Sequence, residues 1–129
     1  HPNVVTLKSE VRRRFMYEIK AYVREVMAEH VVDALAKVKG VASIAVVSLN
    51  EFGHLVGDES PLEKVKMVKL EIDVATDDVA GEVVELIVRT GRTQDGHPGD
   101  GKVLVSRLVR AVRIEDGETG ESALEPASS

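Results

Sequence analysis

The sequence predicts an α+β fold in which two helices cover one face of a four-stranded antiparallel sheet. Two periods in the apolar residues indicate it. Several stretches alternate apolar and polar residues, as half-buried strands do, and two others repeat apolar residues every three or four positions, as amphipathic helices do. A length of 129 residues fits one domain. With no Trp and 3% aromatic residues, the core has to be built from Val, Ile, Leu and Ala, which favours a sheet.

The first half of the fold is predicted from four segments. Residues 17–24 alternate apolar with polar side chains and predict the first strand. Helical spacing follows, and we expect that helix to end at Lys39, with Gly40 as its C-cap. Residues 41–49 are almost entirely small and β-branched, so we expect a strand at the centre of the sheet. Residues 50–61 hold two glycines and a proline and predict a loop. The apolar stripe of the first helix consists of Met27, Val31, Leu35 and Val38.

The second half repeats the pattern. Alternation over residues 68–74 predicts a third strand. Thr76 or Asp77 then caps a second helix. A glycine-rich loop is expected at residues 89–101, and a fourth strand at residues 102–108. The buried stripe of the second helix consists of Val79, Val83, Leu86 and Ile87.

A short further strand is expected at residues 111–114. The main order is strand, helix, strand, strand, helix, strand, which is the ferredoxin-like βαββαβ arrangement. The helices leave one face of the sheet uncovered, and residues 41–49 hold too few polar side chains for a water-exposed face. We therefore expect further copies of the sheet to cover it in a compact homotrimer. The alternative is a monomer with a polar open face.

The two ends of the chain differ in composition from this domain. We expect a basic N-terminal arm over residues 1–15, a folded domain over residues 16–115, and an acidic tail, rich in Gly, Ser and Pro, over residues 116–129. The arginine run at residues 12–14 either contacts an acidic partner or a membrane, or belongs to a solvated arm.

Charge and composition argue against several function classes. A formal net charge of −5 argues against nucleic-acid binding, which depends on neutralising phosphates. Without cysteine there is neither a disulfide framework nor a thiolate metal site. No apolar run approaches the roughly 20 residues that span a bilayer, and no signal peptide is recognisable. We expect a cytoplasmic protein with no membrane insertion.

The segment Gly99-Asp100-Gly101-Lys102 is the strongest candidate for chemistry. Glycines allow backbone amides to turn inward and form a concave anion-binding nest, and the lysine adds a positive charge suited to phosphate. Arg113 could approach this site in its own subunit or in a neighbour's. The alternative is a plain hairpin turn.

The other polar residues predict no further site. The histidines show no metal-ligand spacing. Glu71 and Asp73 share a strand face with Lys69. They could be paired carboxylates for acid–base catalysis, but a charge-balanced surface explains them better, because no nucleophile accompanies them.

Four short segments closely resemble the C-terminal signature of the PII signal-transduction family. They are residues 89–91, 99–103, 112–114 and 117–120. That signature runs Thr-Gly, then Gly-Asp-Gly-Lys, a strand, Arg-Ile-Arg and Thr-Gly-Glu. Residues 64–72 are similar to the family's third strand, and Phe52-Gly53 to the start of its long T-loop. The resemblance covers residues 16–124.

The resemblance implies a homotrimer that holds adenine nucleotides between adjacent subunits. We expect no catalytic residue and no metal site in this chain. In this reading Gly99, Asp100, Gly101 and Lys102 form the phosphate-binding B-loop, and Arg113 reaches the phosphates from the neighbouring chain. The resemblance further places Phe52, Gly53 and His54 near ribose and phosphate, and Ala45, Glu71 and Asp73 around the adenine.

Departures from the family pattern narrow the expected ligand. Glu115 replaces the second arginine of Arg-Ile-Arg, and a carboxylate there repels a γ-phosphate. Leu55 stands where the family has the glutamine that helps to hold Mg²⁺ and 2-oxoglutarate, and Met67 where it has a lysine. The T-loop is short and lacks a tyrosine, and residues 93–98 enlarge the B-loop. We expect ADP or AMP to be favoured over ATP, and no 2-oxoglutarate sensing.

A short T-loop and an enlarged B-loop suggest a divergent subgroup, such as the carboxysome- or transporter-associated PII-like proteins that respond to bicarbonate or energy charge. The predicted function is a regulatory protein whose loops become ordered on nucleotide binding. It would then control a transporter or metabolic enzyme of nitrogen, inorganic-carbon or energy metabolism. The alternatives are a small phosphate-transferring enzyme using Lys102, Arg113 and His54, or a CutA-like metal-tolerance trimer. The latter leaves the glycine-rich loop unexplained.

Overall fold

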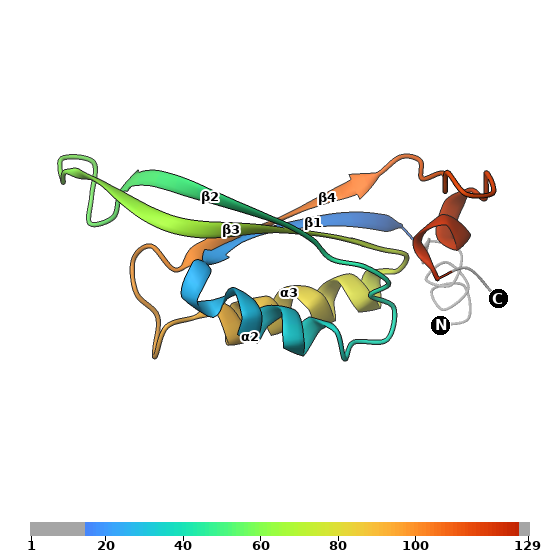
Figure 1. Cartoon of the computed structure of the whole chain (residues 1–129), viewed down its shortest axis with the longest axis horizontal. Helices are drawn as coiled ribbons and strands as arrows, with labels where there is room; N and C mark the ends of the chain where they lie inside the picture. Colours follow the sequence, from blue (N-terminus) through green and yellow to red (C-terminus); the bar gives the residue numbers. More distant parts are fainter. Residues whose placement is uncertain (1–14, 127–129) are drawn as a thin grey trace, which may run out of the picture.

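The computed structural model describes residues 15–126 and confirms the βαββαβ prediction (Figure 1). Two helices lie on one face of a four-stranded sheet with the order β2-β3-β1-β4, in which every pair is antiparallel. The arginine run at residues 12–14 lies outside the described residues. The elements are β1 (Met16–Arg24), α2 (Glu25–Leu35), β2 (Ala45–His54), β3 (Leu62–Val74), α3 (Asp77–Gly91), β4 (Gly101–Leu108) and the 3-10 helix η1 (Gly120–Leu124).

The core lies between the two helices and the central strands β1 and β3. Directly opposed residues in the register, such as Ile19 and Ile72, point to the same face, and this face is covered by the helices. The helical side of the core consists of Val31, Leu35, Val83 and Ile87, as the helical spacing predicts. The buried strand residues are Ile19, Ala21, Val23, Val68, Leu70, Ile72 and Val74.

The prediction that the second strand is central was wrong. β2 lies at the edge of the sheet and pairs with β3 alone. It also begins later, at Ala45, and continues to His54, so the expected loop at residues 50–61 is reduced to the turn at residues 55–61. Its apolar composition therefore does not reflect burial within one chain. Val46 and Val47 remain about half exposed, at 54% and 49%.

The helix boundaries also differ from the prediction. α2 ends at Leu35, four residues before the predicted end. The chain then turns over residues 36–41, for example through a bond of 3.0 Å from the Val38 amide to the Leu35 carbonyl. Val38 is therefore buried as part of a turn, and Gly40 is not the C-cap of the helix. α3 continues into the predicted loop as far as Gly91. This glycine is buried against Val23, where a Cβ would lie 3.3 Å from a valine methyl group, so the helix can pack closely on β1.

The C-terminal part of the described chain forms no fifth strand. At residues 111–114 there is a single bridge, between Val112 and Thr119, instead of the predicted strand. Residues 120–124 form η1 within the segment predicted as an acidic tail. The division of the chain at residues 15 and 115 stays a prediction. None of the helices in residues 15–126 is long and apolar enough to span a bilayer.

Thr76 caps α3, as predicted, by accepting a hydrogen bond from the Val79 amide at 3.3 Å. Replacing this hydroxyl leaves an amide of the first turn without its acceptor. We expect Thr76→Ala to lower the free energy of unfolding by about 1 kcal/mol, measured by urea denaturation.

Thr90→Ala is the matched control, because its hydroxyl donates within the same helix to the Leu86 carbonyl at 2.7 Å. Such back-bonding adds little to helix stability, and alanine has the higher helix propensity. Equal losses in the two variants would contradict the capping role of Thr76.

Candidate functional site

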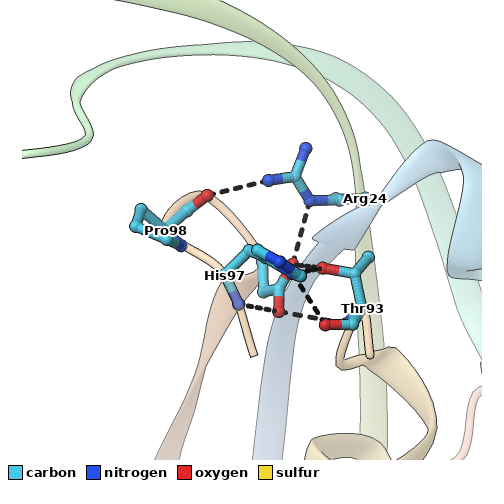
Figure 2. Close-up of polar contacts among 5 residues, drawn as sticks. Arg24, Thr93, His97 and Pro98 are labelled. Carbon is cyan, nitrogen blue, oxygen red and sulfur yellow. Dashed lines mark hydrogen bonds and ion pairs between the residues drawn. The ribbon is translucent and has the colours of Figure 1, made fainter. Parts of the chain in front are cut away.

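The loop at residues 92–100, between α3 and β4, is organised around the carboxylate of Asp100. Oδ1 accepts hydrogen bonds from Arg24 Nε at 3.0 Å and from Thr93 Oγ1 at 2.5 Å. Oδ2 accepts bonds from the amides of Thr93 at 3.0 Å and His97 at 2.9 Å. Figure 2 shows Arg24 extending from the end of β1 toward this loop, where it also donates to the Pro98 carbonyl at 2.8 Å.

The carboxylate of Asp100 is held in its charged form. Partial removal from water alone raises its pKa, but the bonds from Thr93, His97 and Arg24 outweigh this effect and hold the pKa well below its ordinary value. His97 closes the loop through Nδ1, which lies 2.8 Å from the Thr93 carbonyl oxygen. Since a carbonyl only accepts, Nδ1 carries the hydrogen. Asp100 therefore fixes the shape of the loop, and its charge is already stabilised by donors of its own chain.

Gly101 is required where the loop joins β4. Its φ is +116°, and a Cβ at this position would lie 1.7 Å from the Tyr22 carbonyl oxygen. Gly99 has a φ of +89°, and a Cβ there would lie 2.9 Å from an Arg24 nitrogen. The two glycines thus let the loop lie directly against the end of β1.

Two departures from the family pattern lie beneath this loop. Met67 is fully buried, and its terminal methyl group is 3.2 Å from the position of a Cβ on Gly101. Leu55, just beyond β2, has a methyl group 3.2 Å from the position of a Cβ on Gly99. At both positions an apolar side chain packs against the loop.

Lys102 lies on the open face of the sheet, the face without helices, as do three other predicted site residues. The register aligns Lys102 with Tyr22, and the Lys102 ammonium group lies 5.2 Å from the centre of the Tyr22 ring. Ala45 and Glu71 are directly opposed on β2 and β3, and Asp73 is two residues further along β3. The structure therefore brings Ala45, Glu71, Asp73 and Lys102 to one face, spread over several strands.

The charges on this face are mostly paired. Lys69 and Glu71 form an ion pair at 3.0 Å, as expected for a charge-balanced surface. Asp73 differs, because its Oδ1 is buried and has no hydrogen-bond partner among the described residues. Its burial, with Glu18 directly opposite on β1 and Glu71 nearby, raises the pKa of Asp73 above its ordinary value.

The remaining predicted residues lie apart from these. Phe52, Gly53 and His54 end β2, and Phe52 is 63% exposed. The ring nitrogen Nδ1 of His54 bonds the Ser60 carbonyl across the hairpin turn. Arg113 belongs to the segment between β4 and η1. Figure 1 shows this segment at the opposite end of the sheet from the loop at residues 92–100. One chain alone therefore does not bring Arg113 to the loop.

A cavity of about 580 Å³ adjoins the loop between α3 and β4. Its wall is apolar where Val84, Val88 and Val103 line it, and Arg92 and His97 line it beside the loop. Sequence analysis missed Arg24, Arg92 and Thr93. Thr93 was noticed only as part of an insertion, and nothing in the pattern of β1 distinguishes Arg24 from an exposed strand end. Among residues 15–126 there is no cluster of three or more His, Asp or Glu suited to a metal ion.

Fold and loop together define a ferredoxin-like protein with a rigid glycine-rich loop and basic side chains at one end of its sheet. A family profile described as "Nitrogen regulatory protein P-II" matches residues 16–118. The nitrogen regulatory protein P-II of Klebsiella oxytoca is 34% identical over 116 residues, covering 84% of this chain and 100% of the relative.

Solved structures agree with this similarity. The B. subtilis GlnK–ATP complex superposes with a TM-score of 0.73 at 29% identity, covering 85% of this chain and 96% of the other. Arabidopsis thaliana PII bound to citrate gives a TM-score of 0.71 at 29% identity, covering 91% and 96%. The chain belongs to the P-II family. It is accordingly a regulatory protein and not an enzyme, which confirms the regulatory prediction over the phosphate-transfer alternative.

The close approach of Gly101 to β1 predicts a large effect of one methyl group. Gly101→Ala should lower the free energy of unfolding by about 3 kcal/mol, because the Cβ cannot be accommodated without separating β4 from β1. Thermal or urea denaturation measures the loss. Gly57→Ala is the control, since Gly57 also has a positive φ, +131°, but open space around it. Similar losses in both variants would show that backbone conformation, and not the clash, sets the effect.

The bonds to Asp100 predict a stability that depends on acid. Because its pKa is lowered on folding, the stabilisation is present above the pKa of the unfolded state, about 4, and is lost as the pH falls below it. Asp100→Asn should lower the free energy of unfolding at pH 7 by about 2 kcal/mol. It should also flatten the fall in stability below about pH 4.

Asp95→Asn, which changes an exposed carboxylate of the same loop, should leave both the stability and its pH profile unchanged. Urea denaturation from pH 2 to pH 7 makes the comparison. A wild-type profile retained by Asp100→Asn would refute the role of Asp100.

Proposed function

We propose that this P-II family protein binds an adenine nucleotide through the loop Gly99–Lys102, with ADP or AMP favoured over ATP. The observation that carries the proposal is the fixed loop geometry. Asp100 is saturated with donors from its own chain, and Gly99 and Gly101 let the backbone lie close to β1. A loop fixed before the ligand arrives loses little conformational entropy on binding. The relative from B. subtilis is described as an ATP complex.

The charges near the loop support an anionic ligand. Arg92 and His97 line the cavity beside it, and Lys102 follows the loop on the open face of the sheet. Basic side chains with backbone amides are the usual phosphate donors. Asp100, although predicted to bind the ligand, acts in this proposal through the loop that it holds. Gly53 and His54 would contact ribose and phosphate from the end of β2, with Phe52. Ala45, Glu71 and Asp73 would line the adenine.

We propose further that the molecule is a homotrimer in which the open faces of the sheets meet. Three features support this. β2 is an apolar edge strand that its own chain does not bury, Leu104 on the open face is 49% exposed, and a buried oxygen of Asp73 lacks a partner. A buried polar atom without a hydrogen bond costs about 1–3 kcal/mol, and a donor from a neighbouring subunit would remove this cost.

The preference for ADP or AMP follows from the negative charge near Arg113. Glu115 lies 3.9 Å from this guanidinium, so a third phosphate would meet a carboxylate. Leu55 and Met67 provide no oxygen or charge near the loop, which argues against Mg²⁺-dependent 2-oxoglutarate sensing. Bicarbonate is proposed as a second effector. A transporter or metabolic enzyme in the cytoplasm is the proposed partner, controlled by ligand-dependent ordering of the β2–β3 turn.

Lys102→Met tests the nucleotide site. Removing a charged contact to phosphate should weaken ADP binding about tenfold, measured by isothermal titration calorimetry and by the rise in melting temperature with ADP. Lys66→Met, which changes an exposed lysine of β3, should bind ADP as the wild type does.

Light scattering on the same samples should give three chains per particle. The proposed function would be refuted if none of ADP, AMP and ATP raised the melting temperature of the wild-type protein. A monomeric particle would refute the intersubunit site.

A further inference from the structure

The guanidinium of Arg113 is surrounded by groups of its own chain. Nε donates to Asp116 Oδ1 at 3.0 Å, and Nη2 donates to Asp116 Oδ2 at 2.5 Å, so the carboxylate is gripped at two points. Nη1 donates to the Ser122 carbonyl at 2.9 Å and to the Glu125 carbonyl at 3.0 Å. One arginine therefore joins the turn that contains Asp116 to the middle of η1 and to the residue that follows it.

The backbone presents Asp116 to Arg113 in a fixed position. The Gly117 amide bonds the Arg113 carbonyl at 2.8 Å, and the Arg113 amide bonds the Glu118 carbonyl at 2.8 Å. The Glu118 amide also donates to Asp116 Oδ1 at 3.1 Å. The carboxylate thus lies opposite the guanidinium because the turn holds it there. The bond to Asp116 and the nearby charge of Glu115 raise the pKa of Arg113 above its ordinary value.

A two-point grip on a planar guanidinium is also the way in which arginine binds phosphate. We propose that Asp116 is an internal substitute for the ligand's phosphate, which competes for Arg113 and so weakens the binding of phosphorylated nucleotides. This inference rests on the proposed function, in which Arg113 serves a neighbouring subunit's site. Arg113 can turn to a ligand only by giving up Asp116.

The competition has a structural consequence. The same guanidinium holds the Ser122 and Glu125 carbonyls, so its transfer to a ligand also removes the bonds that tie down η1. Nucleotide binding should therefore loosen residues 120–125. The segment between β4 and η1, which contains Arg113 and Asp116, lies at the opposite end of the sheet from the loop of the same chain. The signal would therefore pass from one subunit's loop to its neighbour's C-terminal segment.

Asp116→Asn is the direct test, since asparagine keeps the shape of the side chain and removes its charge. We expect ADP and ATP to bind about fivefold more tightly than to the wild type, and adenosine, which has no phosphate, to bind equally. Glu118→Gln is the matched control. It removes the same charge two residues away and leaves the backbone bonds of Glu118 in place, so it should tighten binding much less than Asp116→Asn.

Two more measurements assign any gain to Arg113. Combining Asp116→Asn with Arg113→Gln should abolish the gain, since the released guanidinium is then missing. Hydrogen exchange of the wild type should show faster exchange at the Gly120 and Glu125 amides, which bond Ala111 and Ser122, when ADP is added.

The outcomes separate this inference from the proposed function. Suppose that the wild type binds ADP, and that Asp116→Asn and Glu118→Gln change its affinity for ADP by the same factor. Asp116 then does not compete and the inference is wrong, while the nucleotide site stands. A gain that survives Arg113→Gln also overturns it. If neither wild type nor variants bind ADP, AMP or ATP, the proposed function fails, and the inference fails with it.

Discussion

The arrangement of this molecule's candidate site depends on one ion pair, between Arg24 and Asp100. It links the last residue of β1 to the loop that precedes β4, two segments 76 residues apart in sequence. The same guanidinium also donates to the Pro98 carbonyl, so Arg24 ties the loop to β1 at two places. The loop amides of Thr93 and His97 and the hydroxyl of Thr93 all turn inward to one carboxylate. The loop thereby acquires a single shape before any ligand is bound.

That shape explains why the residues beneath the loop are apolar. Arg24 ties this loop to the end of β1 through Asp100 and the Pro98 carbonyl. Met67 is fully buried next to Gly101, where a polar side chain would need a partner of its own. Met67 and Leu55 are apolar and need no such partner, so they can pack against the glycines of the loop.

The sequence predicted the strands and helices well, and their positions in the sheet and long-range contacts less well. Alternation in β1 and β3 and helical spacing in α2 and α3 are local signals, and they predicted four strands and two helices in the observed order. The position of β2 was wrong because an apolar edge strand and an apolar central strand have the same local pattern, and only the register separates them. Gly99–Lys102 was found because glycine requirements are visible in the sequence. Arg24 was missed because a partner 76 residues away leaves no local mark.

The two arginine–aspartate pairs at the ends of the molecule have different physical characters. Asp100 is 17% exposed and receives two backbone amides and a hydroxyl besides Arg24, so this ion pair belongs to a larger set of bonds with little access to water. Asp116 is 38% exposed, and besides Arg113 the amide of Glu118 donates to its carboxylate. Water can replace the guanidinium of Arg113 at low cost, because exposed ion pairs contribute little net free energy. The first pair is therefore suited to permanent structure and the second to exchange, although both join the same two kinds of residue.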